Sequence, residues 1–291
     1  MSFGLLAQLT ASGIVVGSVY ALLGVSFGVI YATTKIFHLA HAVPYAASAY
    51  AAIWGSKALG LPLAAAIALG LVVGVIFGLL IEVFAYRPMR KRNAPLLTIF
   101  LVSLGISVAF PNLLQIIFGP DNQSLPRPGN PTFALGTVTA SRHDVVSVLV
   151  AWVLIAAVVL FIDRTRFGRA VTAMRTNPTM AAAVGIDSRI VYLLVFGLGS
   201  LLVAVAALLF TMNGVATPTM GLQPTLTAFI AAFLGGIGSL RGAALGGLLL
   251  GLVSGWSAMF LQVDFGPVVV FGAMFLILLI RPQGLLGKAA V

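Results

Sequence analysis

Long apolar stretches are the feature of this sequence that most restricts its fold. Several of them are long enough to cross a hydrocarbon core of about 30 Å at about 1.5 Å per helical residue. Residues 62–86 read as apolar on every helical face, whereas strands of a transmembrane barrel alternate polar and apolar residues. Only 8% of the residues are charged, against about a quarter in soluble domains. The sequence therefore predicts an all-α fold, a polytopic transmembrane helical bundle that forms a single domain over residues 1–291.

Nine segments are predicted to span the membrane, within a range of about 8 to 10 spans because some segments are short or broken. They are residues 8–31, 39–56, 62–86, 95–118, 144–162, 190–212, 225–239, 242–261 and 266–280. Cytoplasmic loops are enriched in Lys and Arg. The best assignment places all of the 16 Lys and Arg residues inside except Lys57, Arg127 and Arg142. It predicts an external N-terminus and a cytoplasmic C-terminus.

Several function classes are disfavoured by the composition. The net charge of +10 does not indicate nucleic-acid binding, because the positive residues lie between the spans. Ion-driven transporters need charges near the bilayer centre, but Glu82 and Asp163 lie at the inner ends of their spans, close to Arg87 and Arg164. No lysine is followed by Ser or Thr as a Walker A loop requires. The energy for uphill transport must therefore come from outside the chain.

Catalytic and metal motifs are also missing from the sequence. There is no cysteine and no G-x-S-x-G motif. His38 and His41 are three residues apart, but no third ligand lies nearby in sequence, which favours a structural or pathway role over a metal site. The chain is therefore predicted to be a non-enzymatic transport protein without a cofactor.

Glycines at four-residue spacing, such as Gly13 and Gly17, predict closely packed helices.

Three interruptions mark a candidate solute path. They are residues 32–44 ending at Pro44, the span that we expect Pro111 to break, and the segment from Asn213 to Thr225. Unwound backbone at membrane depth is tolerated only where it faces protein or a wet cavity. The predicted path residues are polar groups in or beside broken spans: Ser18, Tyr20, Tyr31, His38, His41, Tyr45, Asn112, Asn213 and Thr225.

Two connections are long. Residues 119–143 hold four prolines and are predicted to form an ordered outer loop with little regular structure. Within the inner loop 163–189, Asn177 can cap a helix, Pro178 suits its first position, and Gly185 suits the left-handed residue beyond its end. This pattern predicts a short cytoplasmic helix. From capping alone, a solvated connector is an equally good interpretation of the loop.

Four sequence stretches, spread in order along nearly the whole chain, resemble the permease subunits of branched-chain amino acid ABC transporters. They are GSVYALLG (17–24) with the following AH pair (40–41), RTRFGRAVTAMRTNPTMAAAVGI (164–186), FLGGIGSLRGAALGG (233–247) and RPQGLLG (281–287). Where this chain has HLAHA (38–42), members of the family usually have a sequence like NFAHG. This departure leaves the solute open between branched-chain amino acids and other small organic solutes, such as urea or short amides.

The resemblance implies a set of partners in a bacterial inner membrane. They are a second permease subunit (a copy or a paralogue), two cytoplasmic ABC ATPase subunits and an external solute-binding protein. The capped helix would then be the coupling helix that the ATPases push, with Arg169, Arg175, Asn177, Pro178, Ala182 and Gly185 as its predicted residues. Two alternatives remain: a stand-alone channel or facilitator for a small solute such as urea or an amide, and a membrane-embedded scaffold or enzyme subunit.

Overall fold

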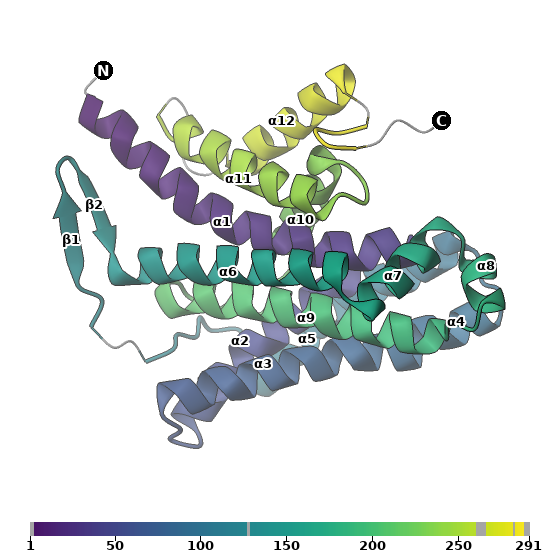
Figure 1. Ribbon diagram of the computed structural model, residues 1–291. Coiled ribbons are helices and arrows are strands. Elements are labelled where there is room, and N and C mark those ends of the chain that lie inside the picture. The colour runs from purple at the N-terminus through teal and green to yellow at the C-terminus, as the bar shows by residue number, and fades with distance from the viewer. Residues whose placement is uncertain (1–2, 127–128, 260–265, 282, 288–291) are drawn as a thin grey trace. The chain divides into compact units, whose positions relative to one another are not determined.

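The computed structural model describes residues 3–126, 129–259, 266–281 and 283–287 (Figure 1). Arg127 and Lys288, two of the 16 Lys and Arg residues assigned to loops, lie outside the described residues. The helices are α1 (Phe3–Thr34), η1 (Leu39–His41), α2 (Ala42–Lys57), α3 (Leu63–Leu80), η2 (Ile81–Tyr86), α4 (Arg87–Lys91), α5 (Leu96–Phe118), α6 (Arg142–Arg164), α7 (Arg166–Thr176), α8 (Pro178–Ala183), α9 (Ser188–Asn213), α10 (Leu222–Gly235), α11 (Leu240–Ser257) and α12 (Gly266–Ile280). The strands are β1 (Thr132–Leu135) and β2 (Val138–Ser141).

The predicted class, a chain of transmembrane helices, is confirmed. Each of the nine predicted segments coincides with a helix. Within the described residues, six helices are long and apolar enough to cross a membrane: Gly4–Thr34, Leu63–Lys91, Leu96–Phe118, Arg142–Arg164, Ser188–Asn213 and Leu240–Ser257. Helix α2, with 16 residues, and helices α10 and α12 are shorter.

Two sequence expectations were wrong. The outer loop is more regular than predicted, because β1 and β2 pair antiparallel with Leu135 opposite Val138. Gly136 takes a φ of +66° in the two-residue turn between them, a conformation that glycine adopts without steric cost. Pro111 does not break its span, since α5 continues through it. The Asn112 Nδ2 donates a hydrogen bond to the carbonyl of Val108 (2.8 Å), whereas the carbonyl that Pro111 deprives of an amide is that of Ser107, four residues back.

The chain divides into two compact units, and three of the four boundaries between them fall within α1, α6 and α10, while the fourth lies between α5 and β1. The first unit draws on the described parts of Met1–Gly28, Arg127–Ala157 and Leu226–Val291. Its α1 and α11 approach backbone to backbone: a Cβ added to Gly17 would lie 2.7 Å from the carbonyl oxygen of Leu248 and 3.3 Å from the Cα of Gly251. The close packing predicted from glycine spacing is confirmed here.

The C-terminal stretch of the first unit binds the end of α10. The amides of Leu285 and Leu286 donate to the carbonyls of Leu234 and Gly235, both at 2.9 Å. Two of the stretches that carry the family resemblance, 233–247 and 281–287, therefore contact each other. Beside them, a hydrophobic cluster of α10, α11 and α12 residues is buried around Ile230, with Tyr20 packed against it.

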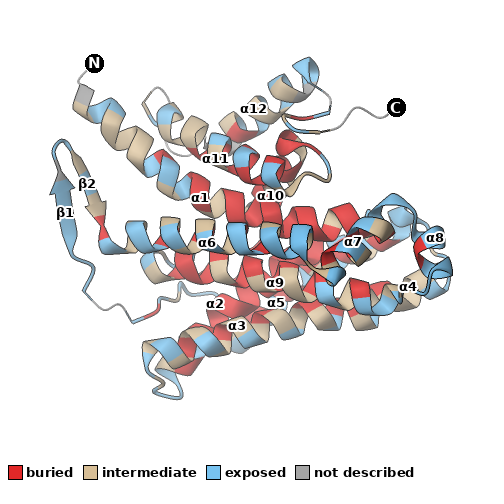
Figure 2. Cartoon of the chain, in the orientation of Figure 1, coloured by how far each residue is buried: buried red, intermediate tan, exposed pale blue. Residues whose placement is uncertain are grey.

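The second unit comprises Val29–Pro126 and Val158–Thr225. Within it, α2, α3 and α9 pack against one another, and Figure 1 shows α3 and α9 running side by side. Glycines on α3 allow α2 and α9 to pack closely against it. A Cβ added to Gly74 would lie 2.9 Å from the Cβ of Ala204 on α9 and 3.1 Å from the Cβ of Ser48 on α2. Residues 38–50 are all buried, so η1 and most of α2 form the interior of this unit (Figure 2).

Candidate solute path and coupling segment

The three segments that the sequence predicted as interruptions lie in the second unit, and two of them do interrupt a helix. Residues 35–38 are not helical, and the chain stops again between α9 and α10, at residues 214–221. A Cβ added to Gly221 would lie 3.0 Å from the Cα of Ala42, so the second break lies directly on the start of α2. Only glycine permits this approach.

A narrow crevice lies where these segments meet. Its walls are Ala42, Val43, Ala46, Ser107, Phe110, Pro111, Pro218, Gly221 and Leu222. It encloses about 180 Å³ of empty space but is too narrow to admit a water molecule. The side chains are apolar apart from the hydroxyl of Ser107, so the crevice matches a small aliphatic group better than a charged one.

A chain of hydrogen bonds fixes the break after α1 to two other helices. Nδ1 of His38 lies 2.7 Å from the hydroxyl of Tyr86, and this hydroxyl donates to Oγ of Ser103 at 2.8 Å. The same Oγ accepts the backbone amide of Ala40, also at 2.8 Å. Since Tyr86 uses its proton toward Ser103, Nδ1 of His38 is the donor to Tyr86. The network satisfies polar groups of an irregular segment that would otherwise be buried without partners.

Aromatic rings close around His38. Its ring centroid lies 5.3 Å from that of His41, 5.4 Å from that of Tyr86 and 5.2 Å from that of Phe196, each in an edge-to-face arrangement. His38 and His41 are both fully buried. The structure thus brings together two predicted path residues, but in a closed, packed cluster.

The other predicted path residues are dispersed. Tyr45 and Thr225 are buried in the second unit, where the Thr225 hydroxyl donates to the carbonyl of Gly221 (2.8 Å), and Tyr31 is half-buried. Ser18 is buried in the first unit and accepts a hydrogen bond from Nε1 of Trp152 (3.0 Å). Asn112 and Asn213 are exposed.

The predicted short helix is present. Oδ1 of Asn177 accepts the amide of Met180 at 3.0 Å, Pro178 is the first residue of α8, and Gly185 has a φ of +86°. Sequence-based capping therefore predicted both ends correctly. An unpredicted helix, α7, precedes it and is capped by Thr165, whose Oγ1 accepts the amide of Gly168 at 3.1 Å.

Helix α8 presents most of its surface outward, as Figure 2 shows. Only Ala181 is buried, at 3% exposure, and it holds the helix to the chain. Met180 and Val184, four residues apart and therefore on one helical face, are 66% and 76% exposed. Of the predicted coupling residues, Arg169 and Arg175 lie on α7, and all six are exposed.

Comparison with known proteins matches this chain to the family described as "Branched-chain amino acid transport system / permease component" over residues 9–280. The chain belongs to this permease family. The high-affinity branched-chain amino acid transport system permease protein BraD of Pseudomonas aeruginosa is 34% identical, with 98% of this chain and 96% of that protein covered. LivH of Escherichia coli is 31% identical over 96% and 95% of the two chains, and a probable LivH of Methanocaldococcus jannaschii is 28% identical over 94% and 90%.

Sequence reasoning missed some residues that complete the buried site of this family member. Tyr86, Ser103 and Phe196 hold His38, yet they lie far from it in sequence and on different helices. No local signal links them. Tyr86 ends the π-helical segment η2, and such wide turns are frequent at functional sites, but their occurrence cannot be read from composition.

Proposed function

We propose that this chain is the transmembrane permease subunit of an ABC importer for branched-chain amino acids or a similar small organic solute. Two such permease subunits form the membrane path. Separate cytoplasmic ATPase subunits supply the energy, and an external binding protein delivers the solute. Membership of the permease family supports the general class, and the relatives' names support the solute class.

The observation that carries the coupling part of this proposal is the exposed apolar face of α8. A six-residue helix is too short to be stable alone, but α8 is capped at both ends and anchored by Ala181. Met180 and Val184 are large apolar side chains left without cover, which is typical of a surface that meets another protein. When the ATPases close on ATP, they push α8, and the motion reaches the spans through α7 and α9.

The crevice supports the solute class. Its walls are small and mostly apolar, which suits an aliphatic side chain such as that of Leu, Ile or Val once the crevice widens, and its present narrowness is what a closed section of a path requires. We expect Ala46→Val, which adds two methyl groups to this crevice, to reduce uptake of leucine more than uptake of alanine. Equal reductions for both solutes would count against the crevice as part of the path.

The first test is capture of the ATPase. The detergent-solubilised chain with Met180→Ser and Val184→Ser is compared with a matched control carrying Thr179→Ser and Ala183→Ser, which changes exposed positions of the same helix. We expect wild type and control to co-purify with the ATPase subunit and the first variant to lose it. Absence of ATPase from all three samples, together with solute flux by the purified chain alone, would instead establish the facilitator.

A further inference from the structure

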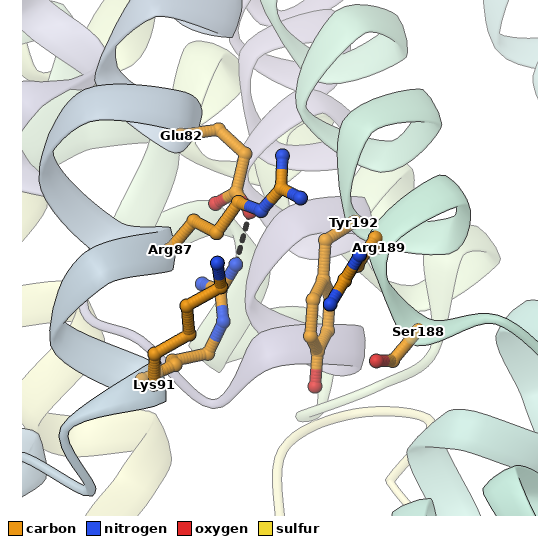
Figure 3. Close-up of a pocket in the computed structure, with 7 residues that line it drawn as sticks. Glu82, Arg87, Lys91, Ser188, Arg189 and Tyr192 are labelled. Carbon is orange, nitrogen blue, oxygen red and sulfur yellow. Dashed lines mark hydrogen bonds and ion pairs between the residues drawn. The ribbon is translucent and has the colours of Figure 1, made fainter.

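A basic pocket lies in the second unit, between the α3 to α4 segment and the first turns of α9 (Figure 3). Its volume is about 300 Å³. Four cationic side chains, Arg87, Arg90, Lys91 and Arg189, line it together with Glu82 and Tyr192. Figure 3 shows the side chains of the two helical segments turned toward one another across this space.

The charges of this pocket are not balanced. Glu82 is the only acidic residue of its lining, and its Oε1 already accepts a hydrogen bond from Nη2 of Arg90. The guanidinium of Arg90 also lies 4.2 Å from the ring centroid of Tyr192. The carboxylate of Asp187, just outside, accepts the backbone amide of Arg189. The four cations of the lining therefore share the single carboxylate of Glu82, and the exposed Lys91 and Arg189 have no ion pair among the described residues.

Unused hydrogen-bond donors in the pocket point to an anionic ligand. Nε of Arg87 and Nη1 of Arg90 are buried and have no hydrogen-bond partner among the described residues, and Oε2 of Glu82, a single acceptor, is likewise buried and unpartnered. Buried donors are nearly always satisfied in native proteins, and leaving one unsatisfied is unfavourable. Guanidinium groups match the geometry of phosphate oxygens, and an ammonium such as that of Lys91 adds a point charge.

The surroundings of the pocket indicate where the phosphate comes from. Apolar side chains on the same helical segments are exposed: Phe84 by 74%, Ile190 by 56% and Leu194 by 48%. Both segments belong to helices long and apolar enough to cross a membrane. An acyl chain can thus lie along these side chains while its headgroup enters the pocket, and basic pockets between transmembrane helices are known to receive anionic headgroups.

We propose that this pocket binds the phosphate headgroup of an anionic phospholipid such as phosphatidylglycerol. The headgroup bridges the cations of the α3 to α4 segment to Arg189 at the start of α9. The site needs only that the chain spans a bilayer, so it stands apart from the proposed function in transport.

The test is native mass spectrometry of the full-length purified chain titrated with dioleoyl-phosphatidylglycerol, dioleoyl-phosphatidylcholine or inorganic phosphate. The pocket variant carries Lys91→Gln and Arg189→Gln, two exposed positions that leave the Glu82 to Arg90 ion pair intact. The matched control carries Arg92→Gln and Arg166→Gln, which removes two exposed charges outside the pocket lining. Thermal unfolding of both variants reports whether they fold.

We expect wild type and control to bind phosphatidylglycerol in preference to phosphatidylcholine, and the pocket variant to bind it at least about tenfold more weakly. Equal weakening in both variants would overturn the proposal, because the attraction would then be general rather than local. Displacement of the lipid by inorganic phosphate at equal concentration would overturn the lipid as the source. Absence of lipid binding, with ATPase capture lost only in the pocket variant, would assign the cations to a protein partner instead.

Discussion

Replacing Asn177 by Ala and Gly185 by Ala together should unfold α8 and uncouple transport. The Asn177 side chain is the N-cap, and losing such a cap costs about 1 kcal/mol. None of the described residues lies within 4 Å of a Cβ added to Gly185, so Ala there suffers only the strain of a φ of +86°, about 1 to 2 kcal/mol. If the two costs add, the folded population of the segment falls on the order of a hundredfold.

Two measurements check this reasoning. Hydrogen exchange measures the protection of two backbone amides: that of Met180, which donates to Oδ1 of Asn177, and that of Val184, which donates to the carbonyl of Met180. ATP-driven uptake by the reassembled complex in proteoliposomes measures the function. The control variant, Asn177→Asp with Gly185→Asn, keeps a capping side chain and a residue that tolerates a positive φ. Wild-type exchange rates in the double Ala variant would refute the capping argument. Faster exchange with unchanged uptake would refute the coupling role of α8.

Three further substitutions test packing, the buried network and charge. Gly251→Ala drives a Cβ into the backbone of α1 and should lower the melting temperature, with a loss of about 1 to 3 kcal/mol in the free energy of unfolding. A Cβ added at Gly272 meets no atom of the described part of the chain within 4 Å, so Gly272→Ala is the control, and equal melting of the two variants would contradict this account. Tyr86→Phe removes the hydroxyl beside His38 and should cost about 1 to 3 kcal/mol in the same assay, so a variant as stable as wild type would contradict the network. Burial and a neighbouring arginine lower the pKa of Lys35, so the folded chain disfavours its charged form and gains stability as pH rises through that lowered pKa toward the ordinary one. Lys35→Gln should therefore melt higher than wild type at pH 7 and lose this advantage above the ordinary lysine pKa; a constant difference between the two across that range would argue against it.

Local signals in the sequence were sufficient wherever the structure is decided locally. The ends of α8 follow from Asn177, Pro178 and Gly185, which lie within nine consecutive residues and act through their own backbone. The apolar spans follow from length and composition alone, because a bilayer accepts few other structures. The two breaks at 35–38 and 214–221 were visible from clustered Pro, Gly and polar residues.

Sequence-based predictions failed where the structure depends on contacts between residues that are distant in sequence, or where a helix tolerates a residue that usually ends it. Pro111 alone predicts an interruption, but α5 continues through it. Asn112, chosen for the path as a polar residue in a span, lies on an exposed face and donates to the carbonyl of Val108. His38 was chosen for the path as a polar residue beside a broken span; the structure buries it, but its partner Tyr86 lies 48 residues away, and no periodicity reaches that far.

The π-helical segment η2 connects the two charged and polar regions of the second unit. Its backbone bond runs from the amide of Arg87 to the carbonyl of Glu82, one residue longer than an α-helical bond. Glu82, at one end, pairs with Arg90 in the basic pocket, while Tyr86, at the other, holds His38. The two side chains belong to one helical turn, so we expect the proposed headgroup, when it binds the cations of α4, to bear also on the hydroxyl that fixes the break after α1. Buried hydrogen-bond networks rigidify the segments that they join, so we expect binding in the pocket to affect the packing around His38 through this one turn.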